Sequence, residues 1–184
     1  MLGVEAVASN RLVIGGPMGG NGGLVGAIDD VAIWNVARSA EEIAADFAVG
    51  ADDTNTDLGG HWALDEASGS AAIDASTYAN DGVLGGTGAA TEAPTRDGLL
   101  LTGSSTVEVR FKVDAAATGW TVLVQKSTGG GGTNRTYGLW VNQDTGQLQV
   151  DTQEAGGQQY WNSAGGVVQT GQWNELARDR KSVV

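Results

Sequence analysis

Glycine divides this chain into short apolar segments: thirty of its 184 residues are glycine. Glycine weakens the interior of helices and strands and is favoured where a turn needs a positive φ. Lysines are few, at three residues. We therefore expect a fold with many turns, few long helices and short strands.

Apolar and polar residues alternate over residues 106–113, which is the pattern of a strand with one buried face. Val107, Val109, Phe111 and Val113 share the apolar side. Further short strands are expected at 12–14, 28–34, 61–64, 98–101, 120–124, 137–141, 147–150 and 171–176. Residues 142–146 connect two of them as a hairpin turn. Strands at this spacing predict an all-β fold, an antiparallel β-sandwich.

One short helix is predicted near residues 40–48. Ser39 and Glu42 have the spacing of a capping box, in which each satisfies a backbone amide of the other. The apolar stripe comes from Ile43, Ala44 and Phe47. Gly50 is a natural end point for the helix.

The charge of the chain excludes several classes of partner. Its formal net charge is −12, which repels phosphate backbones and anionic lipid. We therefore expect no nucleic-acid partner. No apolar run approaches the roughly 18 residues of a membrane helix, so we expect no membrane insertion. The absence of cysteine excludes disulfides, thiolate nucleophiles and cysteine-based zinc sites.

An internal linker and the two ends of the chain indicate how the sequence is divided. Residues 51–60 are acidic and polar and are predicted to be a linker. Residues 1–5 lack the basic start of a signal peptide. The last six residues, DRKSVV, match a reading-frame translation of a common sequencing adapter, so we expect 179–184 to be a non-native tail without a structural role.

Two stretches resemble opposite ends of one known module. Residues 26–43, GAIDDVAIWNVARSAEEI, are similar to the closing segment of the LamG-like family of concanavalin A-like jelly rolls. Residues 61–69, HWALDEASG, with 72–76 and 80–84, resemble its opening segment. Residues 138–141 and 171–173 fit its middle strands. The resemblance implies a jelly-roll sandwich and a secreted or cell-surface location.

The order of these segments is the reverse of the order within a module. It suggests that residues 1–50 are the C-terminal part of one repeat and 61–178 the N-terminal part of the next, with neighbouring repeats in a longer chain. The family places its first and last strands side by side. Residues 1–50 are therefore expected to complete 61–178 as a permuted sandwich, with Val31 or Ile33 near Trp62 or Leu64.

The chain lacks the residues that catalysis on this fold requires. Glucanases of the family carry Glu-x-Asp on one strand, and no Glu here is followed two residues later by Asp. His61 is the only histidine, no nucleophile-elbow motif accompanies it, and we interpret it as a polar residue at the rim. We expect no catalytic residues and predict that the protein is not an enzyme.

Calcium is the expected cofactor, as a structural ion. Asp29 is predicted on the strand face of Val31 and Ile33, where an ionised carboxylate needs a partner. The resemblance brings Asp74 and Asn80 beside that strand, and oxygen ligands of this kind suit Ca²⁺. In the alternative interpretation, Asp29 caps backbone amides and Asp74 makes an Asx turn.

The tryptophans divide by their surroundings. Trp34, Trp62, Trp140 and Trp173 lie in expected strands and are predicted to fill the core. Tyr160, Trp161 and Asn162 lie in a polar, glycine-rich stretch, where aromatic rings and amides together suit sugar binding. A hairpin packed on its own aromatics is the alternative.

These features favour a non-catalytic extracellular module that binds a glycan or a matrix ligand within a larger multidomain protein. Two alternatives stay open. The chain could be a structural spacer repeat of a bacterial adhesin, or an accessory domain of a glycoside hydrolase.

Overall fold

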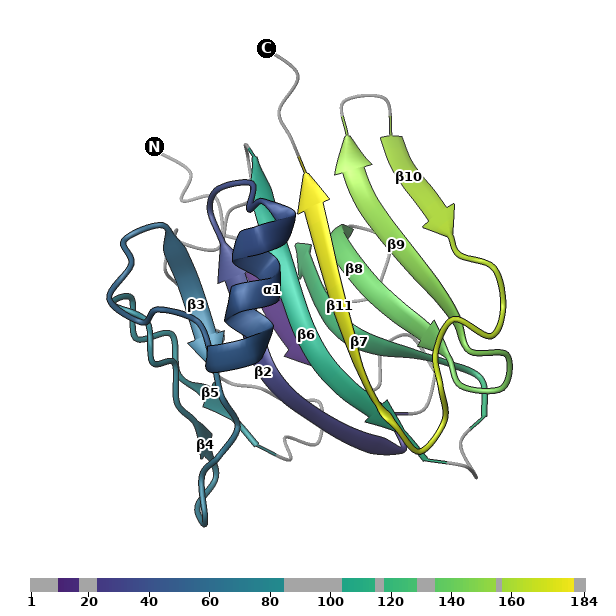
Figure 1. Ribbon diagram of the computed structural model, residues 1–184, viewed down its shortest axis with the longest axis horizontal. Helices are drawn as coiled ribbons and strands as arrows, with labels where there is room; N and C mark the ends of the chain where they lie inside the picture. Colours follow the sequence, from purple (N-terminus) through teal and green to yellow (C-terminus); the bar gives the residue numbers. More distant parts are fainter. Residues whose placement is uncertain are drawn as a thin grey trace, which may run out of the picture.

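The computed structural model describes residues 10–16, 23–84, 104–114, 118–128, 135–154 and 157–180. Two antiparallel sheets face each other and one helix lies outside them (Figure 1). The predicted all-β antiparallel sandwich is confirmed. The strand expected at 98–101 lies outside the described residues.

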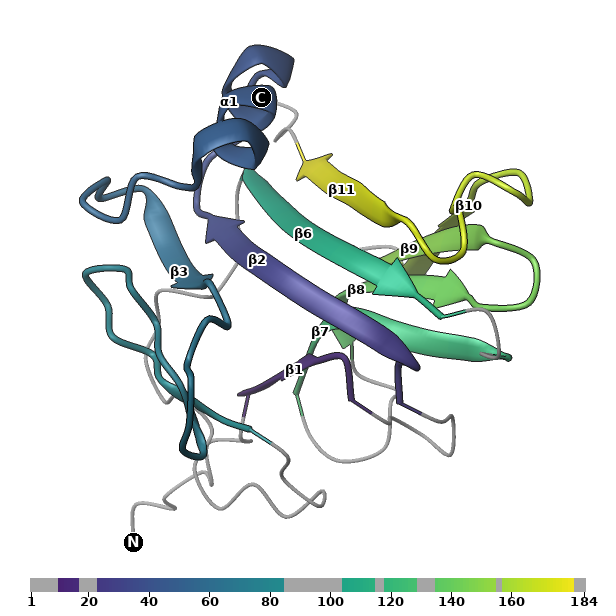
Figure 2. The same ribbon diagram turned by 60° about the horizontal axis from the view of Figure 1, so that its bottom comes forward.

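The two large sheets have five and four strands. In spatial order, the five-stranded sheet contains β1 (Asn10–Ile14), β7 (Trp120–Thr128), β8 (Arg135–Asn142), β9 (Gln147–Glu154) and β10 (Gly157–Asn162). The four-stranded sheet contains β11 (Trp173–Arg180), β6 (Ser105–Val113), β2 (Gly26–Trp34) and β3 (Leu58–Trp62). A small pair, β4 (Ala71–Ala72) and β5 (Gly82–Val83), lies near β3 (Figure 2).

Strand β2 lies inside the four-stranded sheet, between β6 and β3. Val31 is the register partner of Trp62, and Ile33 is that of Gly60. The N-terminal segment thus completes a sheet whose other strands come later in the chain, which is the geometry that a permuted sandwich requires. The origin of the two segments in successive repeats stays a prediction. Leu58, Gly59 and Gly60, which were expected in the linker, belong to β3.

The core lies between the two sheets. The predicted apolar face of β6 is confirmed, because Val107, Val109, Phe111 and Val113 are all fully buried. The opposing sheet contributes Leu123, Val124, Tyr137, Leu139 and Val141 to the same cluster. The side-chain alternation of facing strands thus produces one continuous apolar layer.

A bulge in β2 changes which side chains face this core. Asp30 has a φ of 46°, and the register with β6 shifts between Asp29 and Ala32. Ile28, Val31 and Ile33 pack in the core, whereas Asp29 is the register partner of Arg110 on the outer face. The prediction that Asp29 shares the face of Val31 and Ile33 is therefore wrong, because the extra residue reverses the alternation.

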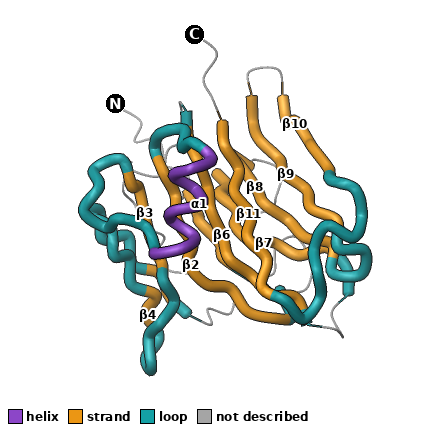
Figure 3. Tube along the Cα trace, in the orientation of Figure 1, coloured by secondary structure: helices purple, strands orange, loops and turns teal. Residues whose placement is uncertain are grey.

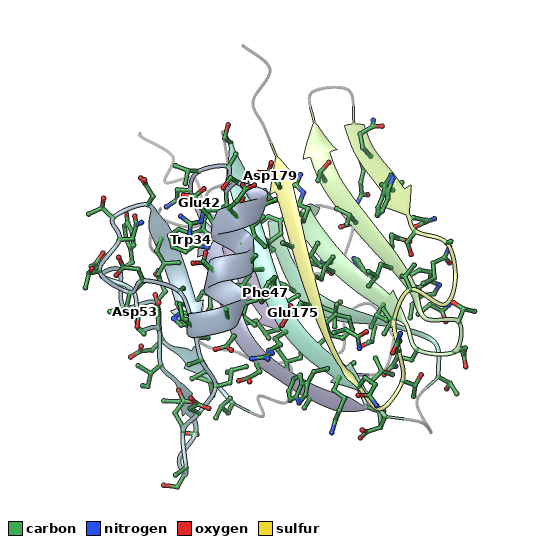
Figure 4. The ribbon with its side chains drawn as sticks, in the orientation of Figure 1. Trp34, Glu42, Phe47, Asp53, Glu175 and Asp179 are labelled. Atoms are coloured by element: carbon green, nitrogen blue, oxygen red, sulfur yellow. The ribbon has the colours of Figure 1, made fainter. Side chains whose placement is uncertain are left out.

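Helix α1 (Ala40–Val49) lies over the end of β2, and its predicted capping box is confirmed (Figure 3). The Ser39 side chain accepts a hydrogen bond from the Glu42 N–H at 3.2 Å, and the Glu42 carboxylate accepts one from the Ser39 N–H at 2.8 Å. Ala32, Trp34 and Leu58 form a second apolar cluster, and Trp34 of this cluster lies beside the helix (Figure 4). No helix in the described part of the chain is long and apolar enough to span a membrane.

Strand β11 continues through Asp179 and Arg180, which pair with Thr106 and Ser105. The Thr106 hydroxyl donates to the Asp179 carboxylate at 3.1 Å. These two residues therefore have a structural role, contrary to the expectation for 179–184. Residues 181–184 lie outside the described residues.

Candidate functional site

Strand β10 carries the predicted binding residues at one edge of the five-stranded sheet. It pairs with β9 from Gly157 to Asn162. The residue after it, Ser163, fixes its end: the Ser163 hydroxyl accepts the Leu148 N–H at 2.9 Å, and the Ser163 carbonyl accepts from the Gln147 side chain at 2.8 Å. The aromatic residues are thus held on a paired strand with an anchored end.

Tyr160 and Trp161 are the two most exposed aromatic side chains in the described residues, at 59% and 62% of their full surface. A Trp or Tyr side chain in a small domain is usually largely buried because its ring is mostly apolar. These two rings do not pack into the core. Their exposure disfavours the alternative of a hairpin packed on its own aromatics and leaves their surfaces open to a ligand.

The two rings lie on opposite faces of β10. Trp161 is the register partner of Val150, which packs against the core, so Trp161 emerges on the core side of the sheet. Tyr160 is the partner of Asp151 and lies on the outer face. Adjacent residues of a regular, unbulged strand point to opposite faces, and the register of β10 with β9 is regular. The sequence predicts Tyr160, Trp161 and Asn162 as one group, because its pattern indicates no strand over these residues. Once β10 is known to be a strand, its period of two separates Trp161 from the other two residues.

The outer face beside Tyr160 is rich in amide groups. Asn162 shares this face, and its register partner is Gln149 on β9. Gln158 lies two residues before Tyr160, and the Tyr160 hydroxyl donates to the Gln158 Oε1 at 2.9 Å. One exposed ring is therefore bordered by three amide side chains that can both donate and accept hydrogen bonds.

The same face continues inward over Gly138 of β8. Asp151 is the register partner of both Tyr160 and Gly138. A Cβ atom at position 138 would overlap the Asp151 carboxylate and the Trp140 indole nitrogen. The glycine thus provides the space in which these two polar groups lie across the sheet.

Trp173 of β11 is a further exposed aromatic residue that sequence reasoning placed in the core. That prediction is wrong, since 47% of its surface is exposed. The Arg110 guanidinium and the Lys112 ammonium group each lie 6.0 Å from its ring centroid. Leu176 packs against the core, so residues 173 and 175 of the same strand lie on the opposite, outer face. The alternation of side chains along the strand was therefore sufficient to predict that Trp173 is exposed.

Asp74 is buried and bound to backbone amides. Its Oδ1 accepts the N–H groups of His61 at 2.8 Å and Ser76 at 2.9 Å, and its Oδ2 accepts that of Asn80 at 2.7 Å. The Asn80 side-chain amide donates to the Gly59 carbonyl at 3.2 Å. Asp74 thereby joins β3 to the loop before β5 by amide capping, and its Asx contact to Ser76 matches the alternative interpretation of this residue.

The three predicted calcium ligands do not fit one cation. Asp74 already accepts three backbone hydrogen bonds, and Asp29 lies on the outer face opposite Arg110. Burial, together with the Asp30 and Asp65 carboxylates, raises the pKa of Asp29, and Arg110 opposes that shift. In the described ranges, no three carboxylate or imidazole side chains come together as a metal site. Calcium binding stays a prediction that this donor geometry does not support.

His61 lies between carboxylates. Its Nδ1 is 2.6 Å from the Asp53 Oδ1, and its Nε2 is 3.9 Å from the Asp30 Oδ1. Asp53 comes from the loop before β3 (Figure 4). Only 6% of the His61 surface is exposed, so the interpretation of His61 as a rim residue is wrong. The ring ties the acidic loop to the four-stranded sheet.

Glu108 is a buried acid beneath α1 that the sequence did not single out. It is 1% exposed and lies on the outer face of β6, opposite Ala32. Burial raises the pKa of Glu108 to about 8, with the Asp46 and Glu42 carboxylates acting in the same direction. The Arg38 guanidinium and the Trp34 indole lower it. The Glu108 side chain is therefore neutral at pH 7 and is an element of stability rather than of the binding surface.

Comparison with known proteins supplies a family for this fold. A laminin G family model, described as the concanavalin A-like lectin/glucanases superfamily, matches residues 84–181. This match covers more than half of the chain. No curated protein and no solved structure matches this chain. The chain belongs to the concanavalin A-like lectin/glucanase superfamily.

Proposed function

We propose that this protein is a non-catalytic, extracellular carbohydrate-binding module whose ligand lies along β10. The observation that carries the proposal is the exposure of Tyr160 and Trp161, at 59% and 62%, on an anchored edge strand. Membership of the superfamily supports a binding role for the domain. The secreted or cell-surface location rests on the family alone.

The outer face of β10 is the better half of this surface for a sugar. A pyranose ring has apolar C–H faces that stack on an aromatic ring, and hydroxyl groups at its rim that need donors and acceptors. Tyr160 offers the ring, while Asn162 and Gln149 offer amides. Residues 160 and 162 lie about 7 Å apart along the strand, so one sugar can reach both. Trp161 projects from the opposite face of the edge strand β10, so it can contact the same ligand only if the ligand extends around that strand.

The ligand is expected to be neutral. The protein carries a formal net charge of −12. Sulfated or uronic-acid glycans would be repelled at moderate ionic strength. Neutral hexose or pentose polymers meet no such barrier.

A glycan array probed with the wild-type chain and three variants tests this function. Tyr160→Ala is expected to abolish binding to neutral glycans and Trp161→Ala to weaken it. Trp173→Ala is the matched control, because it removes an aromatic residue of similar exposure from the other sheet and is expected to leave binding intact. Binding that survives both β10 substitutions would contradict the site. A lack of binding to every glycan would favour the structural spacer repeat or the accessory domain of a glycoside hydrolase.

A further inference from the structure

Strand β10 is the outermost strand of the five-stranded sheet, and no strand lies beyond it in the described part of the chain (Figure 1). It runs from Gly157 to Asn162 without a bulge, since its register with β9 is unbroken. An edge strand presents unpaired N–H and C=O groups that can pair with a strand of another molecule. Monomeric proteins usually protect such an edge with charge, proline or a bulge.

Strand β10 has none of these protective features. Its sequence, GQQYWN, contains no charged residue and no proline, and the residues from Gln159 to Asn162 are exposed. The absence of charged residues extends over the whole segment 155–174. The chain has a formal net charge of −12, so two copies repel each other, and an uncharged segment is where that repulsion is weakest.

The other edge strands of the two large sheets are different. Strand β3 is buried along its whole length. The other two carry charged residues, which are Arg11 on β1 and Glu175, Arg178, Asp179 and Arg180 on β11. Charged side chains on an edge strand oppose its pairing with a second strand. Within the described residues, β10 is therefore the edge strand best suited to such pairing.

A hydrogen bond just after β10 shows which of its backbone groups face outward. The Ser163 N–H donates to the Leu148 carbonyl at 2.9 Å, and these two residues continue the register of β10 with β9. Along an antiparallel strand, successive residues turn their backbone groups alternately to one side and to the other. Because Ser163 faces β9, the backbone groups of Gln158, Tyr160 and Asn162 face away from it. No turn or loop hydrogen bond between described residues uses the backbone of these three.

These outward groups specify one pairing between two copies. A two-fold axis perpendicular to the sheet makes the two β10 strands antiparallel and keeps the outer faces of both copies on the same side. When Tyr160 lies opposite Tyr160 of the second copy, Gln158 lies opposite Asn162 of that copy. Only this register pairs all three outward-facing residues of each copy. It also places two aromatic side chains next to each other on the outer face, which favours the pairing.

We propose that β10 is a self-association surface, through which two copies of this chain form a symmetric dimer with one continuous sheet. The occupant of the edge is a second copy, because the strand is uncharged and complementary to itself in this register. The pairing uses the backbone of the edge and leaves the outer faces of both copies open. The proposal is therefore independent of glycan binding.

Sedimentation equilibrium of the full chain, without any glycan, tests the self-association. The mean mass is expected to rise with protein concentration from 18.7 kDa toward twice that value. Gln158→Pro removes an outward N–H and leaves the bonds to β9 in place. It is expected to weaken the association by about 10-fold or more, because each dimer loses two hydrogen bonds.

Gln158→Ala keeps that N–H and is the matched control, which is expected to associate like the wild type. A folded Gln158→Pro that associates as strongly as the wild type would overturn the proposal. A wild-type chain that keeps the mass of a monomer at every concentration would also overturn it, and would leave the edge to an extended segment of another protein.

Single-cysteine variants test the register independently, because the chain contains no cysteine. In the proposed dimer, position 160 lies opposite itself at a Cα separation of about 5.5 Å, which a disulfide can span. Tyr160→Cys is therefore expected to form a covalent dimer on mild oxidation. Gln158→Cys is not, since the two copies of position 158 are roughly 14 Å apart along the strands. Equal cross-linking of the two variants on a non-reducing gel would overturn the proposed pairing.

Discussion

The buried acid beneath α1 gives the stability of this protein a specific dependence on pH. In the folded chain Glu108 has a pKa of about 8, while an unfolded glutamate titrates near 4.5. Between these values the folded state holds a proton that the unfolded state releases. Stability is therefore expected to fall as pH rises from about 4.5 to about 8, and to level off above that range.

The size of this effect follows from the shift. Each pKa unit corresponds to about 1.4 kcal/mol, so the full shift sets an upper limit of about 5 kcal/mol. Glu108 is 1% exposed, but relaxation around the charged form and the nearby Arg38 reduce the cost. We expect Glu108 to contribute a loss of about 2–4 kcal/mol between pH 5 and pH 9.

Urea denaturation followed by circular dichroism, at pH values from 5 to 9, measures this contribution. The comparison variant is Glu108→Gln, which keeps the shape of the side chain and cannot ionise. The two proteins are expected to have similar stability at pH 5, and the variant is expected to be more stable at pH 9. The pH dependence that comes from the rest of the protein is the same in both proteins and cancels in the comparison. Parallel stability curves for the two proteins would show that Glu108 does not keep its proton in the folded state over this pH range.

Three further predictions concern the supporting structure. Asp74→Ala removes the acceptor of three backbone amides and is expected to lower the free energy of unfolding by about 3–5 kcal/mol in urea; a loss below 1 kcal/mol would show that the amides find other partners. Gly138→Ala is expected to cost about 1–3 kcal/mol by thermal denaturation, because its Cβ would displace Asp151 and Trp140; an unchanged Tm would contradict that close approach. Calcium added to chelator-treated protein is expected to leave the Tm unchanged, because the oxygens of Asp74 are already occupied; a clear rise in Tm would instead support the calcium site predicted from the sequence.

Local patterns were sufficient for those parts of the fold that depend on neighbouring residues. The alternation over 106–113 predicted the buried face of β6, and the Ser39–Glu42 spacing predicted the start of α1. Both features arise within one element, so a single stretch of sequence contains the information that they need.

Features that depend on distant parts of the chain were not predictable in the same way. The bulge at Asp30 has no glycine to announce it, and it moved Asp29 to the outer face. The three amides that bind Asp74 come from β3 and from two loop positions. A cavity lined by Ile28 and Trp62, among other residues, exists only because five strands, β1 to β5, meet around it.

The candidate site lies between these cases. Composition alone drew attention to Tyr160 and Trp161, and the structure shows both to be exposed. Strand alternation could have separated their faces, as it could have placed Trp173 outside the core. The sequence pattern indicates no strand over 157–162, so the two faces of β10 follow only once the strand is known. The strand expected at 171–176 already contains the alternation that places Trp173 and Leu176 on opposite faces.

Glycan binding along β10 is tested most directly by mapping a bound neutral glycan through the chemical-shift changes of backbone amides in the intact chain. If the glycan binds along β10, the largest changes are expected on β10 and the adjoining residues of β9, and they are expected to disappear in Tyr160→Ala. Changes centred on β11 around Trp173, with β10 unaffected, would contradict it.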